Sequence, residues 1–225
     1  MFFGLCVYAS LTNGNTAMAA NFLSKMKSSI GENSHALWRY QAAALWLDLR
    51  RGELQIAAAR AEAALTLAAK AGMLCPQAAI RIVMAQILCE MKEIGEAESH
   101  LSLARAPVYQ SKSLALEYMF LLVQAQVALS RGEGAAGLDC LRQAMALGRK
   151  QGCVDMPWWW PEVVTRLCLK ALDAGIDVPY VQDLVRKRGL FPKSAPVEVA
   201  AWPWALEVYT LGLGLQSQVY GIAAV

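Results

Sequence analysis

The chain has 225 residues and carries 21 lysines and arginines against 18 aspartates and glutamates, a formal net charge of +3. Hydrophobic residues make up 56% of it and charged residues 17%, a balance that excludes a disordered chain and allows a sizeable core. The small excess of positive charge also excludes a stand-alone nucleic-acid binder with a dense basic stripe.

Two uncharged windows, residues 1–24 and 208–225, raise the question of a membrane segment. Polar residues interrupt the first window after a short apolar stretch, and glycines and glutamines interrupt the second. A spanning helix needs about 20 consecutive apolar residues, so we expect no membrane span. The first window also lacks the basic start of a secretory leader, and we interpret it as an amphipathic helix followed by a turn at Asn13-Gly14.

The six cysteines are widely spaced and include no CxxC pair. This spacing does not suit a zinc knuckle or a thioredoxin-type site, so we expect free thiols in a cytoplasmic protein. His100 lies four residues after Glu96 and the pair would face one metal ion, but a zinc site needs three or four ligands. We therefore expect a solvated helix surface at this pair, with no metal and no cofactor.

Residues 34–153 contain an internal repeat. Arg51-Gly52-Glu53 recurs 80 residues later as Arg131-Gly132-Glu133, and Glu93 marks a third copy midway between them. Small residues follow the same spacing of 40, at Ala57, Ala97 and Gly137 and again at Ala64, Ala104 and Ala144. Small residues at fixed positions of a repeat of this length predict helix hairpins whose backbones pack closely.

Each repeat predicts two helices separated by the Gly-Glu turn. Apolar residues recur at helical spacing, which places helices at about 34–50, 76–91 and 112–131 before the turn and at about 54–72, 94–106 and 134–151 after it. Gly72 and Gly152 lie where a helix end favours a left-handed residue. One hairpin cannot bury its apolar face alone, so we expect an all-α fold in which the hairpins of residues 1–190 stack into a right-handed solenoid.

The pattern changes after residue 153. One further helix is expected within 155–174, opening at Pro161, and a short one at about 178–188. Pro192, Pro196 and Pro203 then mark a linker over residues 191–204. Beyond it, residues 205–212 alternate like a β-strand. A strand without a sheet leaves backbone groups unpaired, so we expect residues 205–225 to be poorly ordered, repacked or paired with another copy.

The turn and its small residues resemble the second half of a tetratricopeptide (TPR) repeat. Gly52-Glu53 is followed by Ala57, five residues after the glycine, and by Ala64, twelve after it. The first helix departs from that motif, because Gln41 and Asp48 stand where its aromatic anchors usually lie. We therefore expect TPR-like hairpins with a period of about 40.

The stretch from Leu141 to Gly212 carries a more specific resemblance. It reads LRQAMALGRKQGCVDMPWWWPEVVTRLCLKALDAGIDVPYVQDLVRKRGLFP and then AWPWALEVYTLG. It is similar to the C-terminal helical-repeat region of MalT-like large bacterial transcriptional activators. The resemblance implies an NTP-binding module, then TPR-like repeats, then a DNA-binding domain, with residues 205–212 as the first strand of a winged-helix output domain. A P-loop and the rest of the winged helix are missing from this sequence, so we expect it to be the middle of such a regulator.

Partner-binding residues are expected on the face formed by the first helix of each hairpin. Counted back from the Gly-Glu turn, Trp46, Gln86 and Gln126 occupy equivalent positions, and Arg39 lies two helical turns before Trp46. Polar side chains repeated at one helical phase suit a peptide-binding groove; equally, they only solvate that face.

Trp158, Trp159 and Trp160 form the most conspicuous aromatic cluster of the sequence. Large aromatic residues dominate interface energetics, which favours a partner contact by Trp158 and Trp159. The alternative is that one or two of the rings close the end of the solenoid core, because three consecutive residues cannot all face one ligand.

The sequence has no recognisable set of catalytic residues. We therefore expect a non-enzymatic repeat module of a bacterial transcriptional regulator, which mediates protein–protein interaction, self-association or signal coupling to a DNA-binding domain absent from this chain. Its partner would be a protein or peptide, a second copy included, and DNA would be contacted only through the missing domain. The alternative is a free-standing TPR-like adaptor that binds a peptide or protein in its concave groove.

Overall fold

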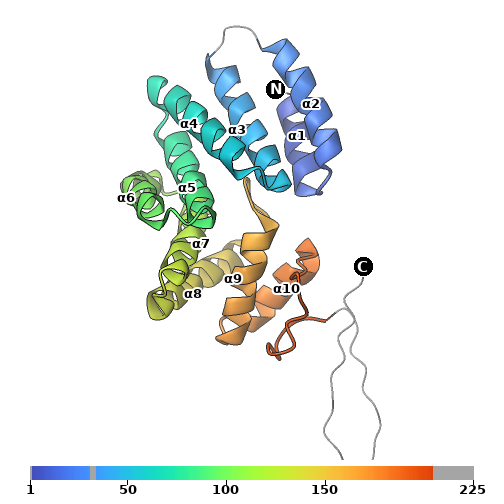
Figure 1. Ribbon diagram of the computed structural model, residues 1–225, viewed down its shortest axis with the longest axis vertical. Helices are drawn as coiled ribbons and strands as arrows, with labels where there is room; N and C mark the ends of the chain where they lie inside the picture. The colour runs from blue at the N-terminus through green and yellow to red at the C-terminus, as the bar shows by residue number, and fades with distance from the viewer. Residues whose placement is uncertain (1, 31–33, 205–225) are drawn as a thin grey trace, which may run out of the picture.

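The computed structural model describes residues 2–30 and 34–204, and every regular element in those ranges is an α-helix (Figure 1). The helices are α1 Phe2–Thr12, α2 Thr16–Ser29, α3 Ser34–Arg51, α4 Leu54–Lys70, α5 Leu74–Glu90, α6 Ile94–Ser111, α7 Leu114–Ser130, α8 Gly134–Gln151, α9 Pro161–Asp173 and α10 Val178–Arg188. The predicted all-helical fold is confirmed for these residues. The expected strand at 205–212 and the tail to residue 225 lie outside the described residues.

The helices of the repeat region end in left-handed residues close to the expected positions. Gly52 and Gly132, in the turns that join α3 to α4 and α7 to α8, have φ of +73° and +84°. The corresponding residue between α5 and α6 is Lys92, with φ of +71°. Gly72 and Gly152 follow α4 and α8 with φ of +65° and +63°, as the sequence predicted. Lys92 therefore holds a conformation that favours glycine.

Helix α6 is longer than the sequence predicted. The prediction ended this helix at about residue 106, and Pro107, which lacks a helical N–H donor, follows directly. The helix instead continues through Pro107 to Ser111 and ends at Lys112, which has φ of +53°. Val108 is 1% exposed in the core. Burial of this side chain stabilises the last turn of the helix, because tertiary packing outweighs local propensity.

The second helices pack closely on the first through their small residues. Ala57 and Ala97 are fully buried at equivalent positions of α4 and α6. At the third equivalent position, a Cβ added to Gly137 would lie 2.6 Å from Leu129 Cγ of α7. No real Cβ tolerates such a distance, so the repeat requires a small residue here because of backbone approach.

The two residues that depart from the TPR motif share one partner. The Asp48 carboxylate is buried and forms an ion pair with the Arg60 guanidinium of α4. Arg60 Nη1 also donates to Gln41 Oε1 at 3.4 Å. Burial raises the pKa of Asp48 above its ordinary value, and Arg60 partly opposes that shift. A buried polar contact thus joins α3 to α4.

The end of the described chain returns to its beginning. In Figure 1, α9 and α10 lie beside the lower ends of α1 and α3. Arg188 Nη2 at the end of α10 donates to the carbonyl of Thr12 at the end of α1, at 2.9 Å. Gln182 Nε2 donates to the carbonyl of Ala201 at 2.8 Å. This bond fixes residues 191–204, which we call the proline-rich segment, to α10. None of the described helices combines the length and apolar character that crossing a bilayer requires.

Candidate functional site

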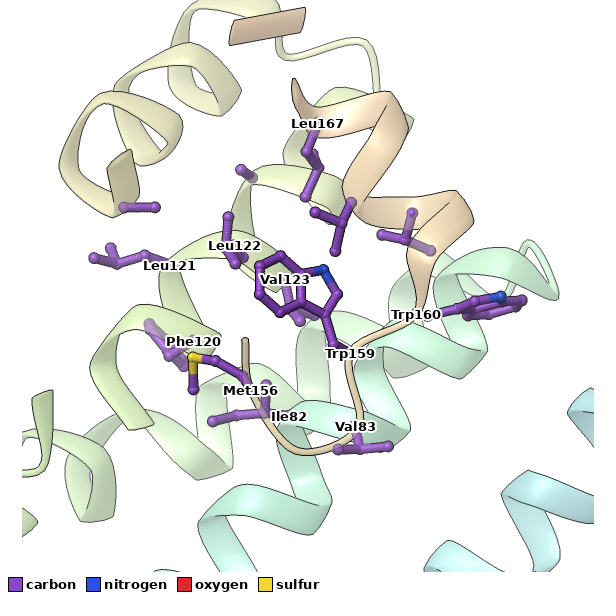
Figure 2. Packing of buried hydrophobic residues seen from close by; sticks show 14 of the residues in the cluster. Ile82, Val83, Phe120, Leu121, Leu122, Val123, Met156, Trp159, Trp160 and Leu167 are labelled. Carbon is purple, nitrogen blue, oxygen red and sulfur yellow. The ribbon is translucent and has the colours of Figure 1, made fainter. Parts of the chain in front are cut away.

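Residues 152–160, which connect α8 to α9, form the centre of the candidate site, and we call them the Trp loop. Pro157 and Pro161 favour an extended backbone before each of them, so the chain does not continue as a helix. Trp159 and Trp160 are both 8% exposed. Figure 2 shows their rings on opposite sides of the loop, with Trp159 directed toward Leu122 of α7. Two of the three tryptophans therefore lie in the core.

Trp158 connects the loop to two helices of the repeat region. Its Nε1 donates to the carbonyl of Ala42 in α3 at 2.8 Å. Its own carbonyl accepts a hydrogen bond from Gln86 Nε2 in α5 at 3.5 Å. The side chain also packs against two hydrophobic clusters, one built on α1 to α3 and the other running from α3 to α10. Trp158 has φ of +58°, a conformation that non-glycine residues rarely adopt.

The two predicted glutamines are buried and connect successive hairpins. Gln126 Nε2 in α7 donates to Glu90 Oε1 at 2.8 Å and to the carbonyl of Gln86 at 3.5 Å. Glu90 also pairs with Arg166 of α9. A buried amide without partners is costly, so these bonds favour one arrangement of α5, α7 and α9. The glutamines therefore contact the protein's own helices and the Trp loop.

The two predicted residues of α3 lie beneath the first hairpin. Trp46 is 4% exposed, and its ring packs edge-on against Tyr8 of α1 with the centroids 5.1 Å apart. Arg39 is partly buried, and its Nη2 lies 3.9 Å from the position of a Cβ added to Gly4 of α1. Helix α1 thus covers the part of α3 that the sequence assigned to a partner.

Two cavities beside the Trp loop bring the predicted residues together. One of about 30 Å³ lies between α5, α7, the loop and α9, and both glutamines and Trp159 line it. The other, of about 210 Å³, lies between α1, α3 and the loop, where Arg39 and Trp46 line it. Trp158 lines both cavities. The first cavity has room for little more than one water molecule. The loop therefore fills the space in front of α5 and α7. We call the face formed by α3, α5 and α7 the inner face.

The sequence analysis missed the residues that receive the loop. Ala42 binds Trp158 through a backbone carbonyl, which no side-chain pattern reveals. Glu90 positions Gln126, yet its place on the helix differs from that of the predicted residues. The run Met156-Pro157-Trp158-Trp159-Trp160-Pro161 did carry a usable signal, because an apolar segment bounded by prolines between two helices favours an extended, docked connection.

The described residues were also compared with the ligand sets of metal sites. Within residues 2–30 and 34–204, no three histidine, cysteine, aspartate or glutamate side chains lie close enough to hold a metal ion. Burial lowers the pKa of His100, and Arg81 lowers it further, with Glu62 and Glu96 opposing. The uncharged imidazole is therefore the favoured form in the fold.

Comparison with known proteins identifies a fold neighbour. No protein-family model matches the chain, and no curated protein matches it. A crystal structure described as BtubC (BKLC) from P. vanneervenii is similar with a TM-score of 0.51 and 14% sequence identity, and the match covers 79% of this chain and 72% of that one. At such an identity the likeness concerns the fold alone.

Proposed function

We propose that the helices of residues 1–190 form a right-handed solenoid of TPR-like hairpins with a period of about 40. Support for the period comes from the left-handed residues. Gly52, Lys92 and Gly132 follow one another at intervals of 40, and so do Gly72, Lys112 and Gly152. A repeated backbone conformation at a repeated position is what a stack of equivalent hairpins requires.

Within this architecture, the protein is a non-enzymatic, cytoplasmic repeat module of a bacterial transcriptional regulator of the MalT-like kind. It mediates protein–protein interaction or couples a signal to a DNA-binding domain beyond its C-terminal end. Support comes from the resemblance of residues 141–212, which includes the Trp loop, α9, α10 and the proline-rich segment. The observation that carries the coupling is a pair of hydrogen bonds, one donated by Trp158 to Ala42 of α3 and one accepted by the Trp158 carbonyl from Gln86 of α5.

The coupling follows from the connectivity of the loop. A ligand or partner that displaces Trp158 from Ala42 and Gln86 also releases the start of α9. Helix α9 packs with α10, and α10 contacts the proline-rich segment through Gln182. A change on the inner face therefore reaches the segment that precedes the proposed output domain. The state with Trp158 docked and the state with Trp158 displaced differ in these discrete contacts, as a switch requires.

The test is genetic and then biochemical. Sequencing across both ends of the gene should reveal an in-frame P-loop module upstream or a winged helix downstream. In that longer protein, Trp158→Ala should change the affinity for promoter DNA, with Leu103→Ala as the control because Leu103 is 55% exposed on α6, outside the proposed relay. If neither module is encoded in frame, or if Trp158→Ala leaves DNA affinity unchanged, the regulatory function is wrong.

The second candidate is a free-standing adaptor. One observation favours it: the inner face holds a non-helical, tryptophan-bearing segment of its own chain, so a peptide of similar composition has a surface to compete for. The adaptor predicts that a synthetic peptide with the sequence of residues 153–161 binds the Trp158→Ala protein more tightly than the unmodified protein. Equal or absent binding to both would exclude this mode of recognition.

A further inference from the structure

A third and larger cavity lies where the first and last helices meet. Its volume is about 540 Å³, and it is bordered by the turn between α1 and α2, the end of α3, the Trp loop and the end of α10. Pockets for small organic molecules have volumes of about 300–1,000 Å³. The cavity is thus large enough for a ligand of nucleotide size, in contrast to the spaces around Trp158.

The wall of this cavity is strongly basic. Arg50, Arg186, Lys187 and Arg188 line it, against a single carboxylate, Asp155. Arg188 lies 3.2 Å from that carboxylate, and Lys187 pairs with Asp183 at 2.8 Å. Within the described part of the chain, Arg50 and Arg186 form no ion pair and no side-chain hydrogen bond. Neither guanidinium group is therefore in direct contact with a described carboxylate, although Glu162 and Asp155 act on Arg50 at longer range.

Arg50 is the more constrained of these two groups. Its Nη2 lies 3.2 Å from the position of a Cβ added to Gly14, which has φ of +76° in the turn between α1 and α2. Burial lowers the pKa of Arg50, Glu162 and Asp155 oppose that effect, and Arg188 adds to it. A cation that is partly buried beside a second cation is stabilised by an added anion.

Buried aromatic residues form the floor of the cavity. Trp46 and Trp159 line it and are 4% and 8% exposed. Their indole Nε1–H groups are closed off from solvent and do not face the cavity. The apolar side chains of Leu11 and Leu190 complete the wall.

We propose that this cavity is a binding site for a small phosphorylated organic molecule. Arg50, Arg186 and Arg188 hold its phosphate groups, since guanidinium pairs with phosphate in a planar, bidentate manner. The ligand bridges the first hairpin, α1 and α2, and the last one, α9 and α10. Its binding therefore stabilises the contact between the two hairpins. This proposal does not depend on a role in transcription.

The test is isothermal titration calorimetry of the full chain with inorganic pyrophosphate and with ADP, at low ionic strength. Each probe should bind once per chain with a Kd below about 1 mM, an affinity within reach of two or three charge-assisted hydrogen bonds. Pyrophosphate at ten times its Kd should also raise the Tm by about 3–6 °C. Absence of pyrophosphate binding at 5 mM, the top of the titration, would overturn the proposal.

Variants distinguish this site from general attraction of anions. Arg50→Gln combined with Arg186→Gln should weaken pyrophosphate binding roughly 10–100-fold, because two charged contacts are lost. Among the described residues, neither side chain forms an ion pair or a side-chain hydrogen bond, so the Tm without ligand should change little. Arg142→Gln removes the same kind of charge from α8, where the side chain is 55% exposed and pairs with Asp139, and should leave the Kd unchanged. Equal affinity in the double variant, or equal loss in Arg142→Gln, would contradict the assignment.

Discussion

Replacement of Trp158 tests the role of the Trp loop in holding the helices together. Truncation of a buried tryptophan to alanine costs about 3–5 kcal/mol, and the partly buried ring of Trp158 should cost about 2 kcal/mol by the same reasoning. The lost hydrogen bond to Ala42 adds about 1 kcal/mol. We therefore expect Trp158→Ala to lower the free energy of unfolding by about 3 kcal/mol, and Trp158→Phe by about 1 kcal/mol.

Urea unfolding followed by circular dichroism measures both effects, provided that the slope m stays constant between the variants. Phenylalanine and alanine both retain a Cβ at φ of +58°, so backbone strain cancels in the comparison. Phe191→Ala is the control and should change stability by less than about 0.5 kcal/mol, because its ring is 66% exposed. A loss as small as the control's in Trp158→Ala would refute the claim that the loop stabilises the inner face.

Three further changes test other parts of the account. Lys92→Gly should raise the free energy of unfolding by up to about 1 kcal/mol in urea unfolding, because a side chain is removed from a left-handed position; a loss would contradict the strain assigned there. Gly137→Ala should lower it by about 1–3 kcal/mol through the clash with Leu129, whereas Gly95→Ala, with nothing within 4 Å, should raise it by about 0.5–1 kcal/mol. Because the pKa of His100 is lowered in the fold, the contribution of His100 to stability is present above pH 6.5 and is lost as the pH falls below that value. In His100→Gln, thermal melts across this pH range should show a smaller decrease in Tm.

The local structure of the repeats was accessible from the sequence. Apolar spacing and the Gly-Glu turns placed α3, α4, α7 and α8 correctly, because those signals arise within one hairpin. Pro161 opens α9 as predicted, since its fixed φ suits a first helical turn. The predicted end of α6 was wrong, because burial of Val108 stabilises the helix beyond Pro107. That burial depends on a neighbouring helix, which local patterns do not describe.

The candidate site was predictable only in part. Trp46, Gln86 and Gln126 share one helical phase in the sequence, but in the structure these residues are buried. The reason is that α1 and the Trp loop cover the inner face, through contacts such as the one from Trp158 to Ala42, 116 residues apart. The basic cavity arises in the same way, because Arg50 and Arg186 approach one another only when the last helix meets the first. Neither contact has a signature within one repeat.

The most direct measurement of the central claim is the exchange of the Trp158 indole proton with solvent, followed by nuclear magnetic resonance. The signal is assigned by its loss in Trp158→Phe. We predict slow exchange and a nuclear Overhauser contact with α3, because this N–H donates to the Ala42 carbonyl. Exchange as fast as that of a free indole, without any contact to α3, would contradict the docking of the Trp loop and the coupling proposed from it.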